Sequence, residues 1–250
     1  MYDTRRQRLR DLSCGAAPHI PQPEGIALPL MPHQLAAVEY ARTTRRMVIA
    51  DRMGTGRDIS AIAALAGTNG GPFLVATPPS LVRQWHEDLE KVLPNHRVRD
   101  FSRSGEITER SLGAADAVIV RHRQFARSAD TIAAVGFGGM VFDQCQALAC
   151  RWTQLATAAR HVIGRLPVES SVVVSSPLVL HTPRSLAGAV EAIGALERHP
   201  SLAAVSGRGT WSGVQRAVEI VDELRGDCLL ARGHEAVMAL IAQRGAIPCS

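Results

Sequence analysis

The first residues whose types and spacing suggest chemistry lie in a glycine-rich turn at residues 47–60, MVIADRMGTGRDIS. The stretch begins as a short apolar strand and reaches Gly54 and Gly56, where backbone N–H groups can approach a phosphate closely. A working phosphate-binding loop then needs Lys for the β and γ oxygens and Ser or Thr for magnesium. This chain has Arg57 and Asp58 at those two places. Taken alone, the turn fits a tight strand-to-helix connection equally well.

Five short apolar runs, each followed by a helical pattern, give the elements that would position this turn. Near-continuous apolar strands that alternate with helices are typical of a parallel sheet covered on both faces. The runs lie at residues 47–50, 73–76, 117–120, 139–142 and 171–175. We therefore predict an α/β fold with a doubly wound parallel sheet and helices on both faces.

The helical patterns divide the rest of the chain. In residues 78–94, apolar positions recur at steps of four, four and three, which predicts a helix with Trp85 in the core. A second helix is expected over residues 30–44, with Pro32 in its first turn. Two amphipathic helices are expected at residues 212–224 and 234–245. We expect a loosely attached lead-in at 1–26, an α/β lobe at 27–197 and a C-terminal helical extension at 198–250.

Composition indicates a globular protein of the cytoplasm. Apolar residues make up 46% of the chain, but no run approaches the ~20 residues of a membrane-spanning helix, and no secretory signal follows the basic N-terminus. Lys91 is the only lysine among the 28 basic residues, a bias that indicates a GC-rich bacterial or phage genome. The five cysteines are scattered without a C-x-x-C pair, and the nine histidines show no metal spacing. We therefore expect free thiols, with neither a disulfide framework nor a zinc site.

Six stretches resemble, in order, the motifs of the first RecA-like lobe of the Swi/Snf family of DNA translocases, in helicase superfamily two. LMPHQ (30–34) resembles the family's Leu-Arg-Pro-Tyr-Gln, and IADRMGTGRD (49–58) resembles Ala-Asp-Glu-Met-Gly-Leu-Gly-Lys-Thr. FLVATPPSLVRQWHEDLEKVLP (73–94) is similar to the family's next motif, and DAVIVRHRQFARSAD (116–130) to its Val-Ile-Thr-Thr-Tyr strand and helix. GMVFDQCQALA (139–149) lies where the family has Asp-Glu-Ala-His, and residues 172–193 lie where it has Leu-Thr-Gly-Thr-Pro. The resemblance covers roughly residues 28–196.

The resemblance implies a nucleotide site for ATP and magnesium. Gln34 would hydrogen-bond adenine, and Asp143 would lie at the magnesium position. The phosphate loop would be formed by Gly54, Thr55, Gly56, Arg57 and Asp58.

Several positions that carry the family's chemistry hold other residue types here. The planar guanidinium of Arg57 is bulkier than an ammonium, so the exchange is not conservative. Asp58 places a carboxylate where phosphate charge would gather. It could ligate magnesium, or pair with Arg57 and close the site, which is the outcome we favour. Gln144 replaces the Glu that accepts a proton from water, and Gln146 replaces the motif's His. We expect no functional catalytic residue, and either no cofactor or only vestigial binding of ATP and magnesium.

The resemblance also implies partners. In the family, turns that follow the strands contact the phosphates of one DNA strand, and a second lobe supplies an arginine finger. A protein partner, such as a separate second lobe, is therefore expected, and DNA is a possible partner. The net charge of +5 fits DNA, but the dispersed basic residues, taken alone, favour a solvated surface slightly more. The corresponding DNA-facing residues are Thr77, Pro78, Ser80, Arg83, Arg121 and Arg123.

Three functions remain open at this point. The first is a degenerate lobe that binds DNA or a protein without hydrolysing ATP. The second is a weak or partner-completed ATPase, in which Arg57 stands in for lysine and Asp58 holds magnesium. The third is a purely structural subunit, in which the helices beyond residue 198 form a partner surface or a brace on the sheet.

Overall fold

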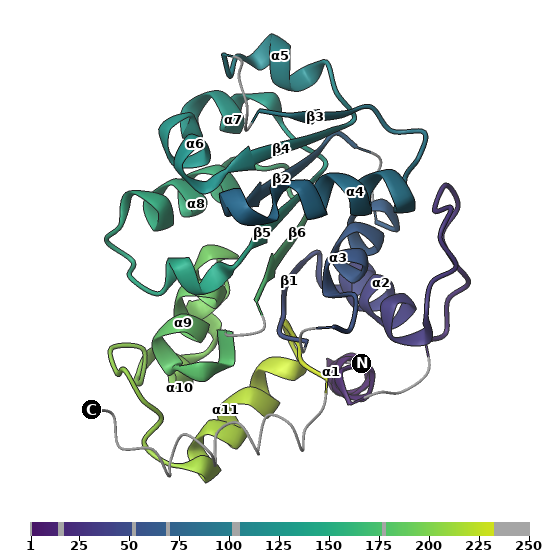
Figure 1. Ribbon diagram of the computed structural model, residues 1–250. Coiled ribbons are helices and arrows are strands. Elements are labelled where there is room, and N and C mark those ends of the chain that lie inside the picture. Colours follow the sequence, from purple (N-terminus) through teal and green to yellow (C-terminus); the bar gives the residue numbers. More distant parts are fainter. Residues whose placement is uncertain are drawn as a thin grey trace.

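A parallel β-sheet runs through the centre of the molecule (Figure 1). The computed structural model describes residues 2–14, 18–51, 54–68, 71–101, 106–176 and 179–232, without the side chains of residues 2 and 3. Within these ranges the sheet has seven strands in the order β3-β4-β2-β5-β6-β1-β7, and every pairing is parallel. The strands are β1 (Arg46–Ile49), β2 (Phe73–Thr77), β3 (Val98–Asp100), β4 (Ala117–Arg121), β5 (Gly139–Asp143), β6 (Ser171–Ser175) and β7 (Leu229–Leu230). The predicted α/β fold with a doubly wound parallel sheet is confirmed.

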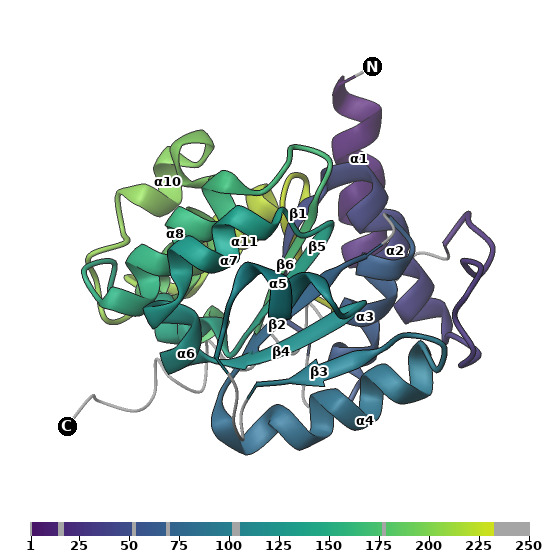
Figure 2. The ribbon, with the colours of Figure 1, turned by 90° about the horizontal axis from the view of Figure 1, so that it is seen from above.

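Helices cover both faces of the sheet, as the view from above shows (Figure 2). One face carries α1 (Tyr2–Ser13), α2 (Pro32–Thr44), α3 (Arg57–Ala66) and α4 (Val82–Val92), the last preceded by the 3-10 turn η1 (Pro79–Leu81). The other face is covered by α5 (Glu109–Gly113), α6 (His122–Arg127), α7 (Ala129–Val135), α8 (Gln154–Arg165), α9 (Pro183–Ala192) and α11 (Val214–Arg225). Shorter turns are η2 (Cys145–Leu148), η3 (Val179–His181), η4 (Leu196–Arg198) and α10 (Pro200–Ala203).

Alternation along the strands separates two cores. Met47 and Ile49 of β1 belong to the core beneath α1 to α4, whereas Val48 belongs to the core on the opposite face. The same alternation places Val75 with the first core and Leu74 with the second. Because both faces are buried, the strands appear in the sequence as continuous apolar runs, the pattern from which they were predicted.

The N-terminal segment differs from the expected loose lead-in. Tyr2–Ser13 forms α1, and its Leu9 and Leu12 are buried. The Ser13 hydroxyl accepts a hydrogen bond from the Ala231 N–H at 2.9 Å, and Arg8 forms an ion pair with Glu39 of α2. Two leucines among many arginines make a weak apolar pattern, so the sequence alone did not indicate this packing.

The described part of the C-terminal extension also packs on the lobe. Helix α11 lies close to the predicted range, and β7 pairs in parallel with β1 at Val48 and Ile49. The second predicted helix, at residues 234–245, lies outside the described residues. Among the described helices, none is long and apolar enough to cross a membrane.

Candidate functional site

The glycine-rich turn connects β1 to α3 at the carboxyl edge of the sheet. Gly54 and Gly56 have φ angles of +82° and +69°, a conformation that residues with a side chain rarely adopt. At Gly56 an added Cβ would also lie 2.9 Å from the Gln34 amide nitrogen, so that side chain would have to shift. The predicted loop glycines are thus required by the backbone.

Helix α2 holds this turn from one side. Gln34 is buried, and its amide oxygen accepts a hydrogen bond from the Met31 N–H at 2.9 Å. A ring nitrogen of His33 lies 2.8 Å from the carbonyl oxygen of Thr55. Gln34, the residue expected to recognise adenine, therefore lies against the glycine-rich turn, and its amide oxygen is engaged at the start of its own helix.

Arg57 lies between two carboxylates. Its Nη2 is 3.5 Å from Oδ1 of Asp58 and 3.8 Å from Oδ1 of Asp143. Arg57 and Asp58 are each 9% exposed, and Asp143 is fully buried. Among the described residues, the Arg57 Nε has no hydrogen-bond partner. The guanidinium is therefore held in the site by charge more than by hydrogen bonds.

Asp58 occupies the first turn of α3, next to the positive end of the helix dipole. Its Oδ2 accepts a hydrogen bond of 2.6 Å from the Gln84 amide of α4. Burial, reinforced by the nearby Asp143 and opposed by Arg57, raises the pKa of Asp58 to about 6. The carboxyl therefore changes its charge near physiological pH.

Asp143, at the end of β5, already has hydrogen-bond donors on both oxygens. Its Oδ2 accepts from the Trp85 indole N–H at 2.9 Å and the Thr77 hydroxyl at 3.1 Å. Its Oδ1 accepts from the Gln144 N–H at 2.7 Å and, more weakly, from the Ser175 hydroxyl at 3.4 Å. The side chain expected at the magnesium position is thus enclosed by protein.

The two glutamines that follow Asp143 interact with each other. The Gln146 amide donates to the Gln144 side-chain oxygen at 2.7 Å, while the Gln146 oxygen is buried without a partner among the described residues. Gln144 has a left-handed φ of +53°. Beside them, the rings of His122 and Phe142 stack with their centres 4.7 Å apart, and burial lowers the pKa of His122.

No family model matches the chain. Over 91 residues it is 34% identical to the chromatin-remodeling ATPase INO80 of Candida albicans, covering 33% of this chain and 7% of the relative. Over 102 residues it is 28% identical to the human chromatin-remodeling ATPase INO80, covering 37% of this chain and 7% of the relative.

Two solved structures cover nearly all of the chain. The Sulfolobus solfataricus SWI2/SNF2 ATPase core domain matches 93% of it with a TM-score of 0.67 and 18% identity. The same organism's SWI2/SNF2 ATPase core in complex with dsDNA matches 90% with a TM-score of 0.63 and 19% identity. The fold is that of a SWI2/SNF2 ATPase core. The chain spans about half of each core, 48% and 45% respectively.

The residues expected to face DNA lie in different environments of this SWI2/SNF2-like lobe. Thr77 is buried and its hydroxyl donates to Asp143, so its side chain points toward the candidate site. Arg121 is half-buried beside Gln124. The surface positions are Ser80, Arg123 and Arg83, and Arg83 pairs with Glu87 on α4. Pro78 is half-buried and directly precedes the turn η1.

The structure adds site residues that the sequence did not indicate. Arg232, just after β7, forms an ion pair with the buried Asp51 and donates to the His33 carbonyl oxygen. Trp85 was expected only as a core residue, yet its indole N–H donates a hydrogen bond to the Asp143 carboxylate. Asp51 could have been recognised from the sequence, because it is an acidic residue that directly follows the first apolar run at 47–50. Nothing in the local sequence signals Arg232.

Proposed function

We propose that this chain is a degenerate Swi/Snf-like lobe that acts by binding, without hydrolysing ATP. The observation that carries the proposal is the position of Arg57, with Nη2 within 4 Å of both Asp58 and Asp143. In a working loop, a cation at this place would be directed at phosphate oxygens. Here its charge is neutralised by carboxylates of the same chain.

The residues present do not fit a triphosphate with magnesium. Asp58 already brings negative charge to the N-terminus of α3, where phosphate would bind, and like charges repel at such distances. Asp143 would have to give up hydrogen bonds from Trp85 and Gln144 to ligate a metal. Asp58 thus takes the place of the anion for which the loop was built.

The proton-accepting group is also replaced. Gln144 presents an amide, which cannot take a proton from an attacking water, and its oxygen is engaged by Gln146. Catalytic groups that act together are strongly non-additive, so losing one already removes most of the rate. Turnover by this chain alone is therefore not expected.

DNA is the binding partner that we favour. Ser80 and Arg83 follow β2 and Arg123 follows β4, so exposed polar and basic groups lie near one edge of the sheet. Arginine side chains on phosphates position a protein on DNA without reading sequence. One solved SWI2/SNF2 core of this fold is in complex with dsDNA, which supports the proposal.

A protein partner would complete the lobe. The chain corresponds to 48% and 45% of the two solved SWI2/SNF2 cores, so a separate second lobe is the partner that best fits this proposal.

Nucleotide binding tests the first half of the proposal. A fluorescent ATP analogue with Mg²⁺ should not bind the native chain, whereas the double variant Arg57→Lys with Asp58→Thr should bind it measurably. Circular dichroism on both proteins checks that they are folded. Native binding that is lost in Arg57→Ala, while circular dichroism shows that this variant is still folded, would overturn the proposal and favour the partner-completed ATPase.

DNA binding tests the second half. Fluorescence anisotropy with a labelled duplex of arbitrary sequence should give an affinity that falls steeply between about 50 and 200 mM salt. Arg123→Glu should weaken binding and reduce the salt slope by about one. Arg216→Glu, an exposed change on α11, is the control. Absence of binding at low salt would remove the DNA proposal and leave the structural subunit.

A further inference from the structure

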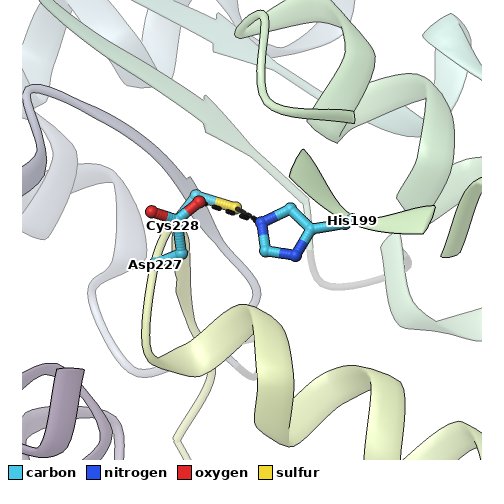
Figure 3. Close-up of side chains that lie close together, drawn as sticks. All are labelled: His199, Asp227 and Cys228. Carbon is cyan, nitrogen blue, oxygen red and sulfur yellow. Dashed lines mark hydrogen bonds and ion pairs between the residues drawn. The ribbon is translucent and has the colours of Figure 1, made fainter. Parts of the chain in front are cut away.

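A histidine, an aspartate and a cysteine meet far from the phosphate loop in sequence (Figure 3). His199 lies between η4 and α10, while Asp227 and Cys228 form the turn between α11 and β7. His199 is 3% exposed and Cys228 is fully buried. The proposed function does not involve these three side chains.

Their ligand atoms converge on one small volume. The His199 Nε2 lies 2.9 Å from Oδ2 of Asp227 and 3.9 Å from Sγ of Cys228. All three potential ligand atoms lie within 4.8 Å of one another. Bonds of about 2.0 Å to nitrogen and 2.3 Å to sulfur at a tetrahedral angle place N and S roughly 3.5 Å apart. The observed spacing is close to this value.

A fourth residue fixes the histidine ring. The Nδ1 of His199 lies 2.9 Å from Oε1 of Glu223, on the opposite side of the ring from the cluster. A carboxylate on one ring nitrogen is the usual partner of a metal-bound histidine, because it sets the tautomer and leaves the other nitrogen for the metal. Glu223 therefore orients Nε2 toward Asp227 and Cys228.

We propose that His199, Asp227 and Cys228 bind a divalent transition-metal ion, for which Zn²⁺ fits best. Thiolate, imidazole and carboxylate are the three protein ligands that zinc takes in four-coordinate sites. The Asp227 side chain is 26% exposed, so water can reach the cluster and fill the fourth position. Hard cations such as Mg²⁺ and Ca²⁺ prefer oxygen ligands alone and do not fit this set.

The same groups can interact without a metal, as an imidazolium between two carboxylates. Burial lowers the pKa of His199, but its hydrogen bonds to Asp227 and Glu223 raise it more, so the net pKa is above the ordinary value. Burial and the nearby Asp227 raise the pKa of the Cys228 thiol well above its usual range. A metal ion would displace both protons, and Arg198, which pairs with Asp227 at 2.8 Å, would compete with it for that carboxylate.

The site would fasten the α10 segment to β7 at the edge of the sheet. The Cys228 carbonyl oxygen accepts a hydrogen bond of 2.7 Å from the Val48 N–H, and β7 follows directly. A metal here would tie the α10 segment to the strand beside β1. This role is structural and does not depend on whether the phosphate loop binds ATP.

The spacing explains why the sequence did not indicate this site. Zinc ligands are usually recognised as pairs separated by two to five residues. Here the histidine is 28 residues before the aspartate, and the two neighbouring ligands, Asp227 and Cys228, form no familiar pair.

Cobalt substitution tests the proposal on the full chain. After dialysis against a chelator, titration with Co²⁺ should give the sulfur-to-cobalt charge-transfer band and visible bands of a four-coordinate thiolate site, saturating at a single ion per chain. Zn²⁺ should displace the cobalt and abolish the bands. Cys228→Ser should lose the charge-transfer band, whereas Cys150→Ser, which removes an exposed thiol elsewhere, should keep it.

Two further variants separate the ligands from the orienting residue. His199→Gln should abolish the four-coordinate spectrum, and Glu223→Gln should weaken Zn²⁺ about tenfold while keeping that spectrum. Circular dichroism on each apo variant shows whether it is folded. No cobalt band in the native chain, or a band retained in Cys228→Ser, would overturn the site and leave an imidazolium ion pair.

Discussion

The Arg57 guanidinium and the Asp143 carboxylate lie 3.8 Å apart, although one belongs to the first turn of α3 and the other ends β5. Asp143 is fully buried, and burying a carboxylate costs free energy unless it is paired with a positive charge or accepts hydrogen bonds. Arg57 supplies the charge for Asp143 and for Asp58 together. We therefore expect Arg57 to act as a structural residue of the folded lobe.

Replacing Arg57 should destabilise the protein strongly. Arg57→Ala leaves two close carboxylates without their cation, and removing one partner of a buried pair costs about 3 kcal/mol. Urea denaturation followed by circular dichroism measures the free energy of unfolding. Arg83→Ala, at an exposed pair with Glu87 on α4, should change it by less than about 0.5 kcal/mol. Equal effects of the two variants would contradict the role of Arg57.

Asp58 should make stability fall as the pH rises. Its pKa in the fold is about 6 against a model-compound value of 3.8, so folding favours the protonated carboxyl. The stabilisation is fully present below pH 3.8 and is lost as the pH rises through about 6, with an upper limit of about 3 kcal/mol.

The comparison with Asp58→Asn isolates this effect from other titrating groups. The free energy of unfolding of the native chain, minus that of the variant, should decrease between pH of about 4 and about 7.5. A difference that stays constant over this range would contradict the raised pKa of Asp58.

Much of the fold was predictable because the buried strands are continuous in sequence. The five apolar runs correspond to β1, β2, β4, β5 and β6, and each is long enough to stand out. The other two were missed because β7 has two residues and the burial pattern of β3 lacks a buried residue. Such short edge strands are defined by their pairing with a neighbour, which the local sequence does not encode.

The contacts of the candidate site were also only partly predictable from the sequence. Pairing between Arg57 and Asp58 was predictable, because the two residues are adjacent in a recognisable turn. The hydrogen bond from Trp85 to Asp143 was not predictable, because it depends on the distance between α4 and β5. Helical periodicity predicted only that Trp85 lies in the core. Arg232 and Asp51 are 181 residues apart in the sequence. Only the folded topology brings them together, so the local sequence could not predict this contact.

The indole of Trp85 should contribute more than its apolar surface. Trp85→Phe keeps an aromatic ring in the core but removes the N–H that donates to Asp143 at 2.9 Å. A buried acceptor that loses a charged hydrogen bond costs about 2 kcal/mol, to which a partial cavity adds. Trp152→Phe, at a side chain 81% exposed, is the matched control and should change the free energy of unfolding by less than about 0.5 kcal/mol. Similar losses in both variants would argue against a specific role for the indole N–H.

Helix α1 should contribute strongly to stability, although the sequence pattern suggested that this segment was loosely attached. Leu12 is fully buried in the core that α1 shares with α2 and α3, so Leu12→Ala should lower the free energy of unfolding by about 3 kcal/mol. Arg5→Ala, at an exposed position on the same helix, should have a small effect because its hydrogen bond to the Thr43 carbonyl oxygen lies at the surface. Urea denaturation of both variants gives the comparison. A loosely attached segment would leave both variants as stable as the native chain, and that result would contradict the packing of α1.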